Sequence, residues 1–200
     1  MKLRKIAAIG AATAVLAGAG TSAAFAADPT DVTVSGASSL AINNPAAGNF
    51  GAVTLDGSVK TTSAAFENIS ATDARGTGAG WNVTVQGTRF AEHDGTDYVA
   101  SGRTLPTSSL AMAAVSITKS DSTSSTEPTA TAGPYTLDSG SAVKISSAAA
   151  DGSGMGSYTF TQGDLDSGTA GVQPLKLTVP ASAYAKTYRS DVTVSIVSGP

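Results

Sequence analysis

Short runs of alternating polar and apolar residues recur along most of this chain, and they narrow its possible folds more than any other feature. The runs are Asp31 to Ser35, Ala52 to Val59, Trp81 to Val85, Ala114 to Thr118, Leu175 to Val179 and Asp191 to Ile196. Successive side chains of a β-strand point to opposite faces, so such a run buries one set and exposes the other. No stretch after residue 27 has a helical period. Many short strands without helices indicate a sandwich or barrel, and we expect an all-β fold, an antiparallel β-sandwich.

The segments between these runs are rich in Gly, Pro, Asn, Asp and Ser, which favour turns. Asp-Gly pairs at Asp56, Asp94 and Asp151 predict tight turns. The polar, low-complexity stretch from Ser120 to Pro134 is either a linker between two domains or a long exposed loop. Few strands are expected after it, too few for a second core. We therefore expect an exposed loop within a single domain.

The first 26 residues have the pattern of a secretory signal peptide. Lys2, Arg4 and Lys5 precede an apolar run of small residues, and Ala24 to Ala26 then gives the small-x-small pattern of a cleavage site. The alternative is an uncleaved anchor helix, but the apolar run is shorter than the ~20 residues that span a bilayer. The sequence thus predicts a signal peptide at residues 1–26 and a mature domain at residues 27–200. We expect no membrane span in the mature chain.

The charge of the chain argues against nucleic acid as a partner, and its lack of cysteine excludes disulfides. Without the three basic residues of the leader, nine Lys and Arg remain against fifteen Asp and Glu, a formal charge of about −6. An acidic exported domain has no electrostatic reason to bind nucleic acid. The chain contains no cysteine, so its core must stabilise it without disulfides.

The residues needed for catalysis or metal binding are scarce. His93 is the only histidine, there is no G-x-S-x-G motif, and a zinc site would need three or four ligands. We expect His93 to lie in a surface turn. Asp164 and Asp166 stand at alternate positions, as in calcium loops, but no Glu closes the loop. The sequence therefore predicts a protein that is not an enzyme, with no catalytic residues, cofactor or metal site.

The only tryptophan, Trp81, follows a charged, glycine-rich loop, and two interpretations of it are open. Trp81, Val83 and Val85 would share one strand face, which favours burial of the indole in the core. Alternatively, Trp81 is an exposed ring on which sugars stack, with Asp73 and Arg75 making polar contacts beside it. Burial is the interpretation that the alternation favours, and Arg75 and Asp73 would then form a weak surface pair.

The stretch "DARGTGAGWNVTVQGTRF" (Asp73 to Phe90) resembles the first motif of the WxL domain family, which has Asp-x-Arg-Gly, a glycine loop and Trp-x-Leu. Ser141 to Phe160 and Leu175 to Pro200 are similar to the family's later segments, so the resemblance covers about residues 50 to 200. The chain departs from the second Trp-x-Leu motif, where it has Val194-Ser195-Ile196. The residues that match the first motif are Asp73, Arg75, Gly76, Gly78, Gly80 and Trp81.

The resemblance implies a function. Members of this family are secreted domains of Gram-positive bacteria that attach non-covalently to the cell surface. The resemblance implies that this chain associates with the cell wall, through peptidoglycan, or with a partner surface protein. It also implies that the residues matching the first motif contribute to binding. The alternative is a structural coat or adhesive-layer protein without wall affinity, which self-associates through exposed strand edges.

Overall fold

The run that contains the tryptophan forms strand β4 (Trp81–Gly87). In the computed structural model, which describes residues 32–166 and 172–199, the side chains of Trp81, Val83 and Val85 are fully buried. Asn82 and Thr84 between them are partly exposed. The predicted alternation is therefore confirmed for this run, and it directs the indole toward the protein interior.

The chain divides into two units, Met1–Val34 and Ser35–Pro200, and every strand that the structure describes belongs to the second unit. The described residues form strands and no helix, which confirms the all-β prediction. None of them belongs to a helix that could cross a bilayer. The expected signal peptide, residues 1–26, lies outside the described residues. Besides β4, the strands are β1 (Leu40–Ile42), β2 (Lys60–Ala64), β3 (Ile69–Asp73), β5 (Ala91–Glu92), β6 (Leu110–Met112), β7 (Val115–Lys119), β8 (Thr129–Ala130), β9 (Tyr135–Thr136), β10 (Val143–Ala148), β11 (Gly156–Gln162), β12 (Leu175–Val179), β13 (Tyr188–Arg189) and β14 (Val192–Ser198).

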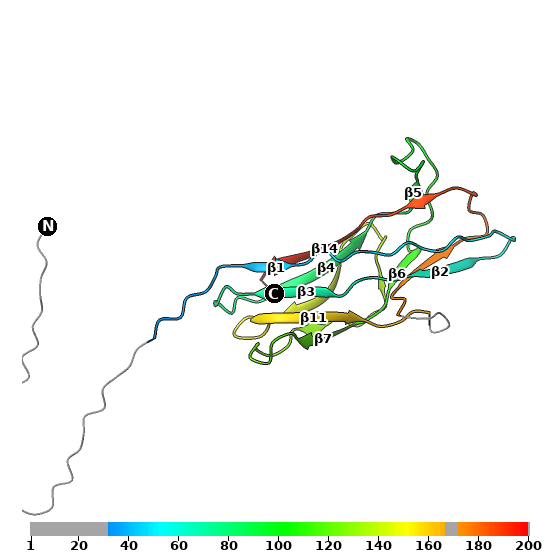
Figure 1. The fold of residues 1–200 in the computed structure, drawn as a ribbon. Helices are drawn as coiled ribbons and strands as arrows, with labels where there is room; N and C mark the ends of the chain where they lie inside the picture. Colours follow the sequence, from blue (N-terminus) through cyan, green and yellow to red (C-terminus); the bar gives the residue numbers. More distant parts are fainter. Residues whose placement is uncertain (1–31, 167–171, 200) are drawn as a thin grey trace, which may run out of the picture. The chain divides into compact units, whose positions relative to one another are not determined.

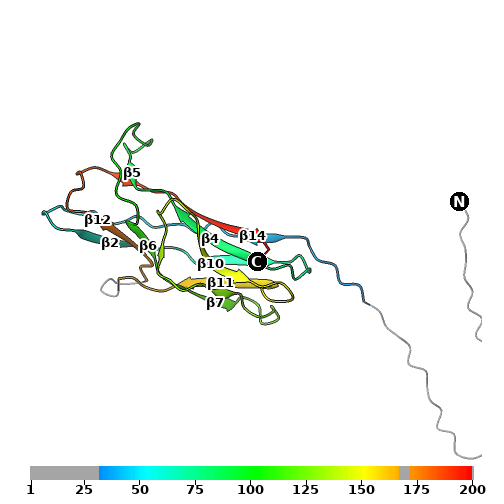
Figure 2. The same cartoon turned by 180° about the vertical axis from the view of Figure 1, so that it is seen from behind.

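The strands pair into antiparallel sheets that form the predicted sandwich (Figures 1 and 2). One layer has the order β1-β3-β11-β7 and the other β14-β4-β10-β8. Strand β1 lies beside β14 and β7 beside β8, so the edges of these two sheets meet. A third sheet, β2-β12-β6-β9, lies toward β5 and β13, which pair separately.

The core between the two layers is built around aromatic side chains. Trp81 comes from β4, and Tyr158 and Phe160 come from β11 in the opposite sheet. The Trp81 ring centroid lies 6.2 Å from that of Tyr158 and 6.3 Å from that of Phe160, and all three side chains are fully buried. Such tilted aromatic contacts add to the stabilisation from burial. Trp81 is therefore the contact that joins the two sheets at this level of the sandwich.

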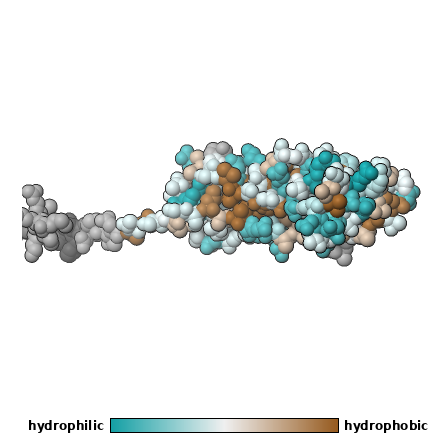
Figure 3. All heavy atoms as spheres, turned by 90° about the horizontal axis from the view of Figure 1, so that it is seen from above, coloured by the Kyte–Doolittle hydropathy of each residue, from teal (hydrophilic) through white to brown (hydrophobic). Residues whose placement is uncertain are grey.

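The outer surface is not uniformly polar. Seen from above, the region over β1 and β14 carries a patch of apolar side chains bordered by polar ones (Figure 3). On these two strands Leu40, Ile42 and Ile196 are half-buried, and Val197 is exposed. Apolar side chains thus line the seam at which the edges of the two sheets meet.

Two predicted strands are wrong. Residues 32–35 are not in a strand, and Asp31 lies outside the described residues. The run from Ala52 to Val59 is not a strand either, because Asp56 bends the chain by accepting hydrogen bonds from the Ser58 amide and the Lys60 ammonium group. An alternating run forms a strand only where the edge of a neighbouring strand is free to pair with it.

The expectation of a wholly exposed loop from Ser120 to Pro134 is also wrong in part. The segment contains β8, which pairs with β10. Ser124 is buried, and its hydroxyl accepts a hydrogen bond from the amide of Ser157 at 3.0 Å. Small polar side chains allow this segment to lie close against the neighbouring strand. A polar composition also fits an exposed loop, so it does not predict this packing.

Candidate functional site

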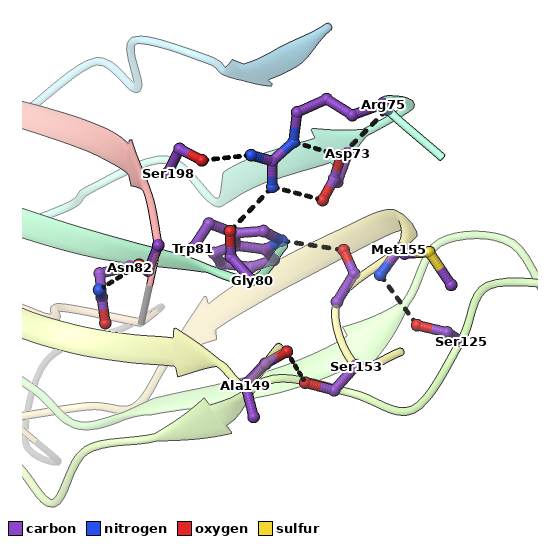
Figure 4. A network of polar contacts seen from close by, with 12 residues as sticks. Asp73, Arg75, Gly80, Trp81, Asn82, Ser125, Ala149, Ser153, Met155 and Ser198 are labelled. Carbon is purple, nitrogen blue, oxygen red and sulfur yellow. Dashed lines mark hydrogen bonds and ion pairs between the residues drawn. The ribbon is translucent and has the colours of Figure 1, made fainter. Parts of the chain in front are cut away.

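The indole of Trp81 is the centre of a polar network at the edge of the core (Figure 4). The ring is fully buried, and its Nε1 donates a hydrogen bond to the carbonyl oxygen of Gly154 at 2.9 Å. Burial of Trp81 confirms the interpretation that the alternation favours. The acceptor belongs to the loop before β11 and not to the Asp73–Gly80 loop that leads into β4. A buried donor needs some acceptor, but the sequence does not show which loop supplies it.

Two glycines are required by this packing. Gly154 has φ +75°, and a Cβ there would lie 2.4 Å from the Cβ of Ala148 and 2.8 Å from Nε1 of Trp81. Gly80 has φ +72°, and a Cβ there would lie 2.6 Å from the carbonyl oxygen of Ala148. Only glycine combines this backbone conformation with so close an approach. The glycines on both sides of the indole therefore have a packing role.

Arg75 lies over the same end of β4 and forms an ion pair with the buried Asp73. Its Nε and Nη2 donate to the two carboxylate oxygens at 2.9 and 2.8 Å, and Nη2 also donates to the carbonyl oxygen of Gly80 at 2.8 Å. The side chains of Arg75 and Asp73 are 13% and 1% exposed. The expected weak surface pair is therefore wrong, since both charges are largely withdrawn from water. The bidentate hydrogen bonding from Arg75 lowers the pKa of Asp73 and raises that of Arg75, against the opposing effect of burial.

The same loop holds the first and last segments of the unit Ser35–Pro200. The amide of Ala37 donates to the carbonyl oxygen of Ala74 at 2.7 Å. At the other end of the chain, the amide of Gly199 donates to Gly80, and Arg75 Nη1 donates to the Ser198 hydroxyl. The loop therefore fastens two segments that lie far apart in the sequence.

Of the residues predicted to bind, the structure brings Asp73, Arg75, Gly80 and Trp81 together in this network. Asp73, Gly80 and Trp81 are buried, and Arg75 is half-buried. Gly78 is half-buried as well, and Gly76 is exposed at the loop tip beside Thr77. The buried members cannot touch a macromolecular ligand while the sandwich stays folded. Their arrangement instead fixes the shape of the loop tip.

The position of the missing second Trp-x-Leu motif also faces inward. Val194 on β14 pairs with Val85 on β4 and is 9% exposed. Ser195, on the other face of the strand, is exposed. An aromatic side chain at position 194 would therefore point toward the core. Neither position 81 nor position 194 therefore directs its side chain toward solvent.

A second cluster, which the sequence did not reveal as a site, lies around the two-stranded sheet β13-β5. The guanidinium carbon of Arg103 lies 4.2 Å from the ring centroid of Tyr184, and Lys186 pairs with Glu92 at 2.9 Å. Tyr98 donates a hydrogen bond to Asp191 at 2.7 Å. Single aromatic residues in turn-rich segments leave no periodic signal. The only hint was that these segments carry several Tyr and Arg residues.

His93 belongs to this cluster and is not the surface turn residue that was expected. It is 4% exposed, and its Nδ1 accepts a hydrogen bond from the amide of Gly95 at 3.0 Å. Its ring meets that of Tyr98 edge-on, with 5.3 Å between the centroids. The turn places the backbone at the surface but folds the imidazole beneath Tyr98.

The charged residues that the structure describes are arranged for ion pairing and turn formation. They contain no group of three or more His, Asp or Glu placed to hold a metal ion. Backbone hydrogen bonding from Arg103 and the nearby Lys186 ammonium lower the pKa of Glu92. The turn amides of Asp97 and Thr96 likewise lower the pKa of Asp94. A glycosidase needs a carboxylic acid whose pKa is raised, and these shifts have the opposite direction.

Comparison with known proteins gives one match. The family model described as "WxL domain surface cell wall-binding" matches residues 25–200. Comparison with curated proteins and with solved structures found no significant match. The matched region includes the whole unit Ser35–Pro200, with both loops that meet at Trp81.

Proposed function

Since the chain belongs to the WxL domain surface cell wall-binding family, we propose that it binds the peptidoglycan of a Gram-positive wall non-covalently and without catalysis. The family places the protein at the cell surface, as a wall-binding domain. The observation that carries the proposal is the extent of the match, residues 25–200, which includes every residue that the structure describes.

The chemistry of the described side chains supports binding without catalysis. The carboxylate of Glu92 is held ionised by Lys186 and by the amide of Arg103. His93 lies beneath Tyr98 with its Nδ1 already bonded. Groups held in this way are poorly placed to transfer a proton to a glycosidic oxygen or to activate water.

We assign the residues of the first motif a positioning role in this function. Asp73, Arg75 and Trp81 hold the loop, the segments near Ala37 and Ser198 and the two sheets in one arrangement. Gly78 and Gly80 permit the loop conformation, and Gly76 lies at its exposed tip. Substitution of the buried members should reduce wall binding only as far as it unfolds the domain.

Export is part of the proposal. The charged n-region, the apolar run and the small residues at Ala24 and Ala26 support cleavage between Ala26 and Ala27. Mass spectrometry of the exported protein should then find an N-terminus that reads "ADPTD". A membrane-bound form that keeps Met1 would contradict this part of the proposal.

A sedimentation experiment tests the function against the self-associating alternative. Mature protein, residues 27–200, is mixed with purified sacculi, centrifuged and assayed in both fractions, beside protein without sacculi. We expect it to pellet only with sacculi, to stay monomeric alone and to release no soluble sugar. The alternative relies on pairing through free strand edges, whereas the edges of the two main sheets meet here, at β1 with β14 and at β7 with β8. Sedimentation of the protein alone as oligomers would favour the alternative.

A further inference from the structure

The exposed aromatic side chains of the described residues gather in one place. Among residues 32–166 and 172–199, only Tyr98 and Tyr184 have exposed aromatic rings, at 44% and 55%. Both belong to the segments around β5 and β13, at the side of the unit away from the C-terminus (Figure 1). A ligand that stacks on an aromatic ring can therefore do so here, and cannot do so at the buried Trp81.

Two hollows meet at this cluster. The larger has a volume of about 1080 Å³ and lies between the segment 47–55 and the segment 183–192. The smaller, of about 360 Å³, lies against residues 101–106. Four residues line both hollows, and we call this shared boundary the ridge: Leu105, Ala183, Tyr184 and Tyr188. Binding sites for small ligands have comparable sizes.

Contacts within the protein hold the ridge in place. The Arg103 guanidinium lies over the Tyr184 ring, within the range of a cation–π contact. The Tyr188 hydroxyl donates a hydrogen bond to the carbonyl oxygen of Tyr184 at 3.1 Å. Lys186, between the two tyrosines, is tied to Glu92. A surface ordered in this way loses little conformational entropy on binding.

The lining of the larger hollow combines apolar and polar groups. Phe50 and Phe90 meet edge to face with 5.7 Å between their centroids, beside Leu177 on β12. Thr187 and Ser190 add hydroxyl groups to the same wall. Lys186 and Arg189 of this lining are matched in number by Asp191 and by Glu92, which pairs with Lys186, and Arg103 at the smaller hollow leaves one net positive charge, too few to favour a polyanion. Flat, uncharged rings with one apolar face and several hydroxyls fit such a lining best.

We propose that the uncharged sugar rings of the wall glycan bind along this ridge, one ring stacked on Tyr184 and its neighbours in the two hollows. This inference rests on the proposed function and names the surface that performs it. The apolar C–H face of a pyranose packs on the phenol ring, while its hydroxyls reach the polar groups of Lys186 and Thr187. A linear glycan suits the site because the two hollows adjoin across the ridge.

The test compares variants of the mature protein on sacculi. Tyr184→Ala removes the stacking ring, and Tyr184→Phe keeps it. Val197→Ala is the matched control, because Val197 is 58% exposed and lies on β14. Binding isotherms are measured on sacculi with and without their phosphate-containing polymers, after circular dichroism shows that all variants are folded. Amide shifts are followed by NMR during titration with chitotriose.

We expect Tyr184→Ala to bind sacculi about tenfold more weakly, while Tyr184→Phe and Val197→Ala bind like wild type. Removal of the phosphate polymers should not change binding, and chitotriose should shift amides from 183 to 189. If wild type binds sacculi and Tyr184→Ala binds equally well, the site is wrong and the proposed function stands. Loss of binding with the phosphate polymers, or a Tyr184→Phe variant as weak as Tyr184→Ala, also overturns it. If wild type does not bind sacculi, the proposed function itself fails.

Discussion

The indole nitrogen of Trp81 donates its hydrogen bond to Gly154, 73 positions further along the chain. This contact joins the loop that opens β4 to the loop that opens β11, which are strands of opposite sheets. The tryptophan of the first motif is thus a structural link between the two layers. The glycines of the loop that leads into it approach backbone and not the ring, since a Cβ at Gly78 would lie near Gly152 and one at Gly80 near the carbonyl oxygen of Ala148. The glycine that lies against the indole is Gly154, where an added Cβ would be 2.8 Å from Nε1.

Replacing Trp81 with Ala should lower the free energy of unfolding by about 3–5 kcal/mol, because it empties a fully buried site between two sheets. Chemical denaturation followed by circular dichroism measures this difference. Sacculus binding should fall only in proportion to the unfolded fraction. A variant that melts like wild type yet no longer pellets would show that the indole contacts the wall itself.

Gly154→Ala should lower the free energy of unfolding by about 2 kcal/mol or more, because the new methyl group collides with Trp81 and Ala148 at a positive φ. Gly152→Ala is the matched control. Gly152 also has a positive φ, +112°, but no atom lies within 4 Å of the added Cβ. It should therefore cost only the backbone strain, about 1 kcal/mol. Equal losses in the two variants would show that the clash with the indole is unimportant.

The sequence predicted those parts of the fold that depend on alternation within one strand. The runs in β4, β7, β12 and β14 became strands because each is long enough to show which face is apolar. Short strands such as β1 and β8 carry too few residues for a pattern. The run beginning at Ala52 had the pattern but no pairing partner. Pairing between distant segments is a property of the whole chain, and local periodicity does not contain it.

The candidate site was predictable to a similar extent. Alternation placed Trp81 inward, and the spacing of Asp73 and Arg75 suggested a pair. The burial of that pair could not be predicted, because it depends on Ser198 and on the segment near Ala37, at opposite ends of the unit. The Tyr184 ridge left only a hint in the composition of its segments, since Arg103 and Tyr184 meet only after the segments around β5 and β13 pair.

Arg75→Ala should destabilise the protein by about 3 kcal/mol, because it leaves the buried carboxylate of Asp73 without its partner. The double variant Arg75→Ala with Asp73→Ala should lose less stability than Arg75→Ala alone, since no unpaired buried charge then remains. Lys60→Ala serves as the control, because the Lys60–Asp56 pair is exposed and should contribute little to stability. Denaturant midpoints of the three variants test these values. If Arg75→Ala were as mild as Lys60→Ala, the ion pair would be no stronger than a surface pair.

Acid should destabilise the protein through Asp73. The pKa of this carboxylate is lowered in the folded state, chiefly by the hydrogen bonds from Arg75. A lowered pKa means that the folded state favours the ionised form, so its contribution to stability is complete above the unfolded value of about 3.9 and disappears as pH falls toward the folded value. Wild type should therefore be more stable than Asp73→Asn at neutral pH, and the difference should narrow below about pH 4.

Thermal melts of both proteins from neutral to acid pH, at constant ionic strength, measure that difference. Asp121→Asn is the control, because the pKa of Asp121 is also lowered but its side chain is exposed in a turn, where it accepts hydrogen bonds only from Thr123. The gap between wild type and Asp121→Asn should stay small throughout, since solvent screens an exposed carboxylate. A gap between wild type and Asp73→Asn that does not change with pH would mean that the hydrogen bonds of Asp73 stabilise the fold without help from its charge.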